Sequence, residues 1–140
     1  MILFCDTSAL VKLYVQEDGT EQVTEQAAAS EAVAVCRVAW VEIMSAMARR
    51  TREQVQDASA IGLARERFVA DWPHYFCLDV TQELVELAGE YADVFALRAY
   101  DCVQLAAAQT LHRELPGEVR FACCDGRLVK AARLLGIVSA

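Results

Sequence analysis

Short apolar runs alternate along the chain with longer segments in which apolar residues recur every three or four positions. The length and nearly continuous apolar character of the short runs predict buried β-strands, which lie at 2–5, 32–36, 75–78, 119–124 and 137–139. The longer segments predict α-helices, which lie at 38–50, 57–72, 81–97, 101–111 and 127–136.

Strands that are apolar throughout and separated by helices are typical of a mostly parallel sheet with both faces covered. We therefore predict an α/β fold with three layers, α/β/α. The 140 residues suit a single domain spanning 1–140, and no repeat, low-complexity tract or long linker divides them. In such a sheet, ligands bind beyond the carboxyl ends of the strands.

Composition narrows the setting of this domain. No run approaches the roughly 18 apolar residues of a membrane span, and the amino terminus lacks the basic and apolar regions of a signal peptide. We therefore expect a cytoplasmic protein without a membrane partner. The net charge of −7 argues against a broad electrostatic grip on nucleic acid, although Arg49, Arg50 and Arg52 form a local cluster. That cluster is also compatible with a solvated helix end.

The cysteines do not predict a zinc site. The chain has six cysteines and two histidines, and no two cysteines have the C-x-x-C spacing. We expect the cysteines in apolar runs to be small interior residues of the strands: Cys5, Cys36, Cys77, Cys123 and Cys124. A metal site in this protein would have to be built mainly from oxygen ligands.

Four of the twenty acids stand out by their positions in the predicted elements. Asp6 and Asp125 directly follow the first and fourth predicted strands, so both belong to the functional edge of the sheet. Asp101 and Glu42 interrupt helix faces that otherwise look buried. If the two strands are neighbours, their backbones lie about 4.8 Å apart. The carboxylates of Asp6 and Asp125 would then repel each other and raise each other's pKa unless a cation lay between them.

Each acid also has a purely structural interpretation. Asp6 and Asp125 are suitable helix caps. Asp101 could pair with Arg98 or Arg113, and Glu42 with Arg49. Taken together, however, the four acids predict a strongly negative pocket with oxygen ligands only, which suits Mg²⁺ or its substitute Mn²⁺.

The segments that carry these acids resemble the PIN domain, and specifically the VapC-type toxins of bacterial toxin–antitoxin pairs. The similar segments occur in the expected order over nearly the whole chain: "CDTSALVKLY", "VEIMSAMAR", "LRAYDCVQLAAA" and "FACCDGRLVKAARLLG". Cys5, Cys102 and Cys124 depart from the pattern, because small or apolar residues are commoner beside the acids.

The resemblance implies a five-stranded parallel sheet of order 3-2-1-4-5, a magnesium-dependent endoribonuclease, frequent dimerisation and a small antitoxin that inserts a segment into the active site. Carried over by motif, the site acids are Asp6, Glu42, Asp101 and Asp125, and Ser8 is a hydroxyl that lines the site. Asp6 and Asp101 would be the principal metal ligands, with Glu42 and Asp125 holding metal-bound water or a second ion. Arg98 is a candidate phosphate contact.

Other functions are compatible with parts of the sequence. A binding module with a weak or idle metal site could act through an antitoxin complex on operator DNA. A haloacid-dehalogenase-like phosphatase would need a second Asp two residues after Asp6, where Ser8 stands, and a receiver domain would need an acid pair. RNA cleavage with and without magnesium separates these alternatives.

The helix faces also suggest an assembly. Two predicted helices offer more apolar surface than one small sheet should need, around Trp40, Ile43, Met44, Met47, Ile61, Leu63 and Phe68. On this basis, and from the resemblance, we predict a homodimer.

Overall fold

A five-stranded sheet forms the centre of the fold in this computed structural model, which describes residues 1–140. All neighbouring strands are parallel, and their order is β3-β2-β1-β4-β5. The strands are β1 (Ile2–Cys5), β2 (Ala32–Cys36), β3 (Phe76–Leu78), β4 (Val119–Ala122) and β5 (Val138–Ser139). The parallel sheet and its order confirm the predicted topology.

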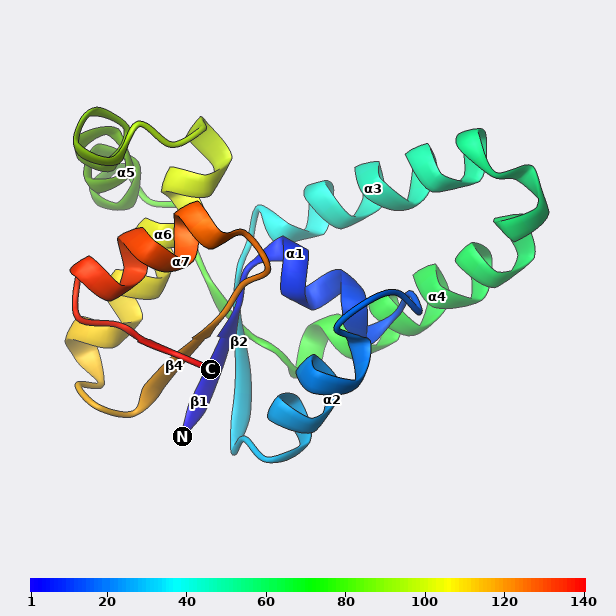
Figure 1. The fold of residues 1–140 in the computed structure, drawn as a ribbon, viewed down its shortest axis with the longest axis horizontal. Coiled ribbons are helices and arrows are strands. Elements are labelled where there is room, and N and C mark those ends of the chain that lie inside the picture. Colours follow the sequence, from blue (N-terminus) through cyan, green and yellow to red (C-terminus); the bar gives the residue numbers. More distant parts are fainter.

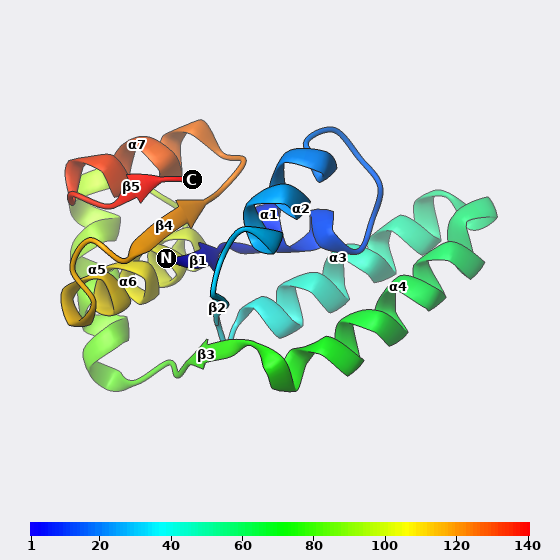
Figure 2. The same ribbon diagram turned by 90° about the horizontal axis from the view of Figure 1, so that it is seen from below.

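Helices cover both faces of this sheet, as Figures 1 and 2 show. One layer contains α5 (Gln82–Phe95), α6 (Ala99–Glu114) and α7 (Gly126–Leu134). The other contains α1 (Thr7–Leu10), α2 (Thr20–Ala28), α3 (Ala39–Glu53) and α4 (Ala58–Asp71). Short 3₁₀ turns are η1 (Val11–Leu13), η2 (Val55–Asp57) and η3 (Trp72–His74). The predicted three-layer architecture is therefore confirmed, and α3 and α4 project past the sheet as a helical hairpin (Figure 2).

The sheet separates two hydrophobic cores because side chains alternate along each strand. In β1, Leu3 and Cys5 pack with the α1–α4 layer, whereas Phe4 packs with α5–α7 and stacks on Phe121 with ring centroids 5.9 Å apart. Both faces of β1 are therefore buried, which explains why its sequence is apolar throughout. None of the helices combines the length and apolar character of a membrane-spanning segment.

Strand register places the first acid. Cys5 pairs with Ala122 at the last position of both strands, and the N–H of Asp6 donates to the carbonyl of Ala122 at 3.1 Å. Asp6 therefore begins the carboxyl edge of the sheet. The fourth strand was expected to run to 124 but ends at Ala122, because β1 offers no strand residue beyond Cys5 to pair with it.

Several sequence-based expectations need correction. Cys123 and Cys124 lie in the loop after β4, where Cys123 is half-buried and Cys124 is exposed, so they are not interior strand residues. The helix predicted over 81–97 ends at Phe95, since Ala96 has a left-handed backbone (φ 52°), and α6 begins at Ala99 rather than at 101. Helices α1 and α2 form between residues 7 and 28, where the periodicity predicted no extended helix.

Most of the residues proposed as a dimer surface lie inside the chain. Ile43, Met47, Ile61 and Phe68 are buried in the core between the sheet and the α3–α4 hairpin, with Trp40 and Met44 packed against it. Of the seven, only Leu63 is largely exposed, at 64%. The apolar faces of α3 and α4 pack against each other and the sheet, so they do not support the predicted homodimer.

Candidate metal and nuclease site

All four predicted acids stand at the amino-terminal ends of helices. Asp6 caps α1 directly after β1, Asp125 caps α7 at the end of the short loop after β4, and Glu42 and Asp101 lie in the first turns of α3 and α6. Figure 1 shows these helix ends near the carboxyl edge of the sheet. The partial positive charge of helix amino termini favours carboxylates there.

Asp6 is the most enclosed of the four acids, with 4% of its surface exposed. Its Oδ1 accepts hydrogen bonds from the N–H of Ala9 at 3.0 Å and from the hydroxyl of Ser8 at 2.8 Å. Its Oδ2 accepts one from the thiol of Cys123 at 3.0 Å. Burial raises the pKa of Asp6, these hydrogen bonds oppose the rise, and the charge of Asp101 adds to it. Asp6 therefore caps α1, as one interpretation of the sequence expected, and the pKa of the same carboxylate is also raised by Asp101.

Glu42 is held by two neutral donors. Thr7 Oγ1 and Gln104 Nε2 each donate to Glu42 Oε1 at 2.9 Å, and Gln104 Nε2 also donates to Thr7 Oγ1 at 3.0 Å. The stripe that Glu42 shares with Ser45 and Ala46 is not buried as the sequence suggested: both are exposed and line a cavity beside Glu42.

Asp101 has no cationic partner at contact distance. It takes part in none of the five ion pairs of the protein, so the alternative pairings with Arg98 or Arg113 are not formed, nor is that of Glu42 with Arg49. Burial raises the pKa of Asp101, and the charges of Asp125 and Glu42 raise it further. The more distant charges of Arg98 and Arg127 oppose these effects.

Asp125 is exposed and caps α7, with Oδ1 accepting from the N–H groups of Arg127 at 2.9 Å and Leu128 at 3.4 Å. Its structural role is therefore real. Its charge also raises the pKa of Asp101, so the capping carboxylate contributes to the negative charge of the site as well. Electrostatic effects thus link Asp101 with each of the other three acids.

Ser8 joins Asp6 to the loop that carries Asp125. Its hydroxyl donates to Asp6 and accepts from the N–H of Cys124 at 2.9 Å. The structure therefore places Ser8 in contact with Asp6. Through these two hydrogen bonds, Ser8 connects the carboxylate of Asp6 to the loop that follows β4.

A cavity of about 460 Å³ opens between α3 and the start of α6. It exposes two of the acids, Glu42 and Asp101, beside two cations, Arg49 and Arg98. Tyr100 also lines it, with 57% of its surface exposed. An anionic substrate could enter here with cations and an aromatic ring beside the carboxylates.

The donor set fits a hard divalent cation, although no three Asp, Glu, His or Cys side chains are already arranged to hold one. Burial raises the pKa of Asp101 most, and the charges of Asp125 and Glu42 raise it further, as expected where carboxylates gather without an ion-pair partner. Mg²⁺ needs only one or two protein carboxylates and keeps several waters, so a preassembled cage is not required. All six cysteines are free thiols.

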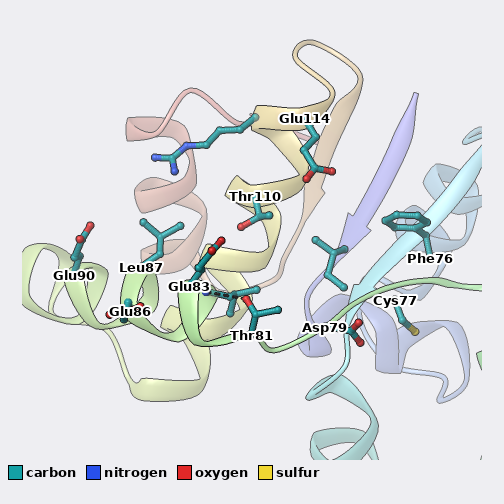
Figure 3. A pocket seen from close by; sticks show the side chains of 13 residues that line it. Phe76, Cys77, Asp79, Thr81, Glu83, Glu86, Leu87, Glu90, Thr110 and Glu114 are labelled. Carbon is teal, nitrogen blue, oxygen red and sulfur yellow. Dashed lines mark hydrogen bonds between the residues drawn. The ribbon is translucent and has the colours of Figure 1, made fainter.

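A larger cavity, about 860 Å³, lies elsewhere. Figure 3 shows it beside the edge strand β3 and helices α5 and α6. None of the four predicted acids lines it; its carboxylates belong to Asp79, Glu83, Glu86, Glu90 and Glu114. Cavity size alone would therefore have pointed away from the converging acids.

Sequence reasoning missed three residues at the site: Thr7, Gln104 and Tyr100. Gln104 could have been found from the sequence, because it is an uncharged amide on an otherwise apolar helix face, one turn after the site acid Asp101. Tyr100 stands directly before Asp101. Thr7 lies between Asp6 and Ser8 within the motif itself.

Similarity to known proteins identifies the family of the chain. Residues 3–133 match the family profile of the PIN domain. The chain is 31% identical to Ribonuclease VapC47 of Mycobacterium tuberculosis (strain CDC 1551 / Oshkosh), over 99% of this chain and 96% of that protein. The chain belongs to the PIN domain family.

Solved structures show the same fold. FitAcB from Neisseria gonorrhoeae superimposes with a TM-score of 0.65 at 16% identity, covering 99% of this chain and 96% of the other. VapBC2 from Rickettsia felis, bound to a DNA fragment from its promoter, superimposes with a TM-score of 0.64 at 12% identity, covering 100% and 98%.

Proposed function

We propose that this protein is a divalent-metal-dependent endoribonuclease, the toxin of a toxin–antitoxin pair. The observation that carries this is the gathering of four carboxylates at the carboxyl edge of the sheet. The charges of Glu42 and Asp125 act on Asp101, the charge of Asp101 acts on Asp6, and Asp101 forms no ion pair. Membership of the PIN domain family and similarity to a VapC ribonuclease support the reaction class.

In this proposal, Asp6 and Asp101 are the principal ligands of Mg²⁺ or Mn²⁺, and Glu42 and Asp125 hold metal-bound water or a second ion. The bound cation lowers the pKa of water and offsets charge on the scissile phosphate. Ser8 and the Ala9 N–H orient the Asp6 carboxylate, as their hydrogen bonds to Oδ1 indicate.

The cavity residues bind the substrate. Arg98 and Arg49 neutralise phosphates, and the exposed ring of Tyr100 stacks on an unpaired base. Water adds to phosphorus as the bond to O3′ breaks, and a proton passes to O3′. The products are a 5′-phosphate and a 3′-hydroxyl.

Partners follow from the same class. We propose that a small cognate antitoxin occupies the site and blocks it; toxin–antitoxin complexes share this fold. We also propose a homodimer, on the basis of the family resemblance alone. The apolar faces of α3 and α4 do not support it, because they are mostly buried within the chain. Confinement to the cytoplasm is also proposed from the family resemblance.

The test is RNA cleavage by the purified protein with Mg²⁺, with a chelator, and after Mg²⁺ is restored. Asp101→Asn should abolish cleavage. The matched control is Asp93→Asn, an identical change at an exposed acid on α5 that lines neither cavity described above. Cleavage that persists in Asp101→Asn, or that ignores the chelator, would contradict the proposal. A wild-type protein that fails to cut RNA but binds operator DNA with an antitoxin would favour the binding module.

A further inference from the structure

Gln104 is one of only three polar or charged residues that are buried, with 2% of its surface exposed. Its Nε2 makes the two hydrogen bonds to Thr7 and Glu42, whereas its Oε1 is enclosed without any partner. A buried amide destabilises the fold unless its atoms are satisfied. Gln104 is only partly satisfied, and both of its partners lie at the candidate site.

The hydrogen bonds among Gln104, Thr7 and Glu42 form a closed triangle. Glu42 Oε1 receives two donors, one from each partner, both at 2.9 Å. A carboxylate anchored through one oxygen has little freedom to turn. The other oxygen, Oε2, makes no hydrogen bond within the protein, and Glu42 lines the cavity.

This triangle also crosses from one helical layer to the other. Helix α6 packs in the core on one face of the sheet, through Leu105 among others. Helices α1 and α3 pack in the core on the opposite face, through Ala9 and Ile43. Gln104 reaches over the carboxyl edge of the sheet and links the two layers beside the acids.

The hydrogen bonds of Gln104 also affect Asp101, because both residues lie near the start of α6. Asp101 lies three residues before Gln104, so both side chains project from the same side of the helix. Anchoring Gln104 to Glu42 therefore sets the separation between α3 and the first turn of α6. The cavity that Glu42 and Asp101 line opens between these two segments.

We propose that Gln104 is a positioning residue that orients Glu42 and fixes the spacing of Glu42 and Asp101 across the cavity. The proposal deepens the proposed function and rests on it, because the spacing matters for binding a divalent cation. Residues that orient metal ligands typically change metal affinity or activity about 10- to 100-fold when replaced.

The alternative is that Gln104 only fills space between packed helices. Gln109 provides a matched control: it lies on the same helix, is buried, and has an Oε1 without a partner. Gln109 takes no part in the hydrogen bonds among the site residues. A purely structural role predicts similar behaviour for Gln104→Met and Gln109→Met, both of which keep side-chain length and remove the amide.

The experiment compares these two variants with the wild-type protein in Mn²⁺ affinity by calorimetry, in kcat and KM for RNA, and in the crystal. We expect Gln104→Met to weaken Mn²⁺ binding and lower kcat by about 10- to 100-fold while KM for RNA changes little. The carboxylate of Glu42 should turn away in its crystal structure. Gln109→Met should retain wild-type values for all of these.

Wild-type Mn²⁺ affinity in Gln104→Met, with Glu42 unmoved, would overturn the proposal. If Gln104→Met does not fold, Thr7→Val removes the other donor to Glu42 and should also weaken Mn²⁺ binding, whereas Thr7→Ser should restore it; unchanged binding in Thr7→Val would then overturn the proposal. If the wild-type protein itself binds no Mn²⁺, the proposed function fails, and the orientation of Glu42 in the Gln104→Met crystal alone decides the positioning role.

Discussion

Replacing Asp6 by Asn removes one charge from the most buried acid of the site while keeping the size of its side chain. The amide Oδ1 of Asn can still accept from Ser8 and from the N–H of Ala9, as Asp6 does at 2.8 and 3.0 Å. Asn is nearly as good a helix cap as Asp, so the loss of capping should be a few tenths of a kcal/mol at most. Burial raises the pKa of Asp6, which means that its ionised form is disfavoured in the fold. We therefore expect the metal-free variant to be as stable as the wild type, or more stable.

The effect of metal should be the opposite. A cation present at 100 times its dissociation constant stabilises the folded state by about 2.7 kcal/mol. For a chain of this length, that corresponds to a rise in Tm of roughly 10 °C. The wild type should show this rise in Mg²⁺, whereas Asp6→Asn should show little or none and should not cleave RNA.

Asp6→Ala serves as the companion variant. It removes the ligand and also the cap, so the metal-free protein should lose about 1 kcal/mol. The assay is thermal unfolding by circular dichroism with and without Mg²⁺, alongside RNA cleavage. If Asp6→Asn gained as much Tm from Mg²⁺ as the wild type, the assignment of Asp6 as a metal ligand would be refuted.

The pH dependence of the metal-free protein gives the same comparison a second readout. Because the pKa of Asp6 is raised by burial, the folded state keeps a proton that the unfolded chain releases near pH 4. The resulting stabilisation is complete below the unfolded pKa and is lost as pH rises through the folded pKa. Asp101, raised by burial and by Asp125 and Glu42, acts in the same direction. The stability of Asp6→Asn relative to wild type should therefore increase as pH rises through this window, and a constant difference would contradict this account.

Three further predictions concern the substrate, the metal and assembly. Tyr100→Ala should raise KM for RNA by about 5- to 100-fold, the value of one stacked base, with Tyr100→Phe near wild type; equal values for both variants would exclude stacking. EDTA should abolish cleavage yet leave the circular dichroism spectrum unchanged, because no cluster of cysteine and histidine side chains is placed to hold a structural zinc; unfolding on chelation would overturn this. Light scattering at micromolar concentration should report a homodimer, and a monomer would remove that proposal.

The sequence alone determined the layered fold because both signals involved are local. Runs such as residues 2–5 are apolar at every position, since strands of a parallel sheet are buried on both faces. An acid directly after such a run must emerge at the carboxyl edge, so Asp6 could be placed without coordinates. The α3–α4 periodicity was equally clear, but it did not reveal that the two helices bury their apolar faces against each other.

Tertiary structure decided what depends on contacts between distant segments. The triangle of Thr7, Glu42 and Gln104 joins residues 35 to 97 positions apart, and no local pattern specifies which buried amide meets which carboxylate. The early end of β4 depended on where β1 stops, so the exposure of Cys124 was not readable from its apolar run. Periodicity reports which side of an element is buried, whereas register and helix packing decide which side chains meet across the edge of the sheet.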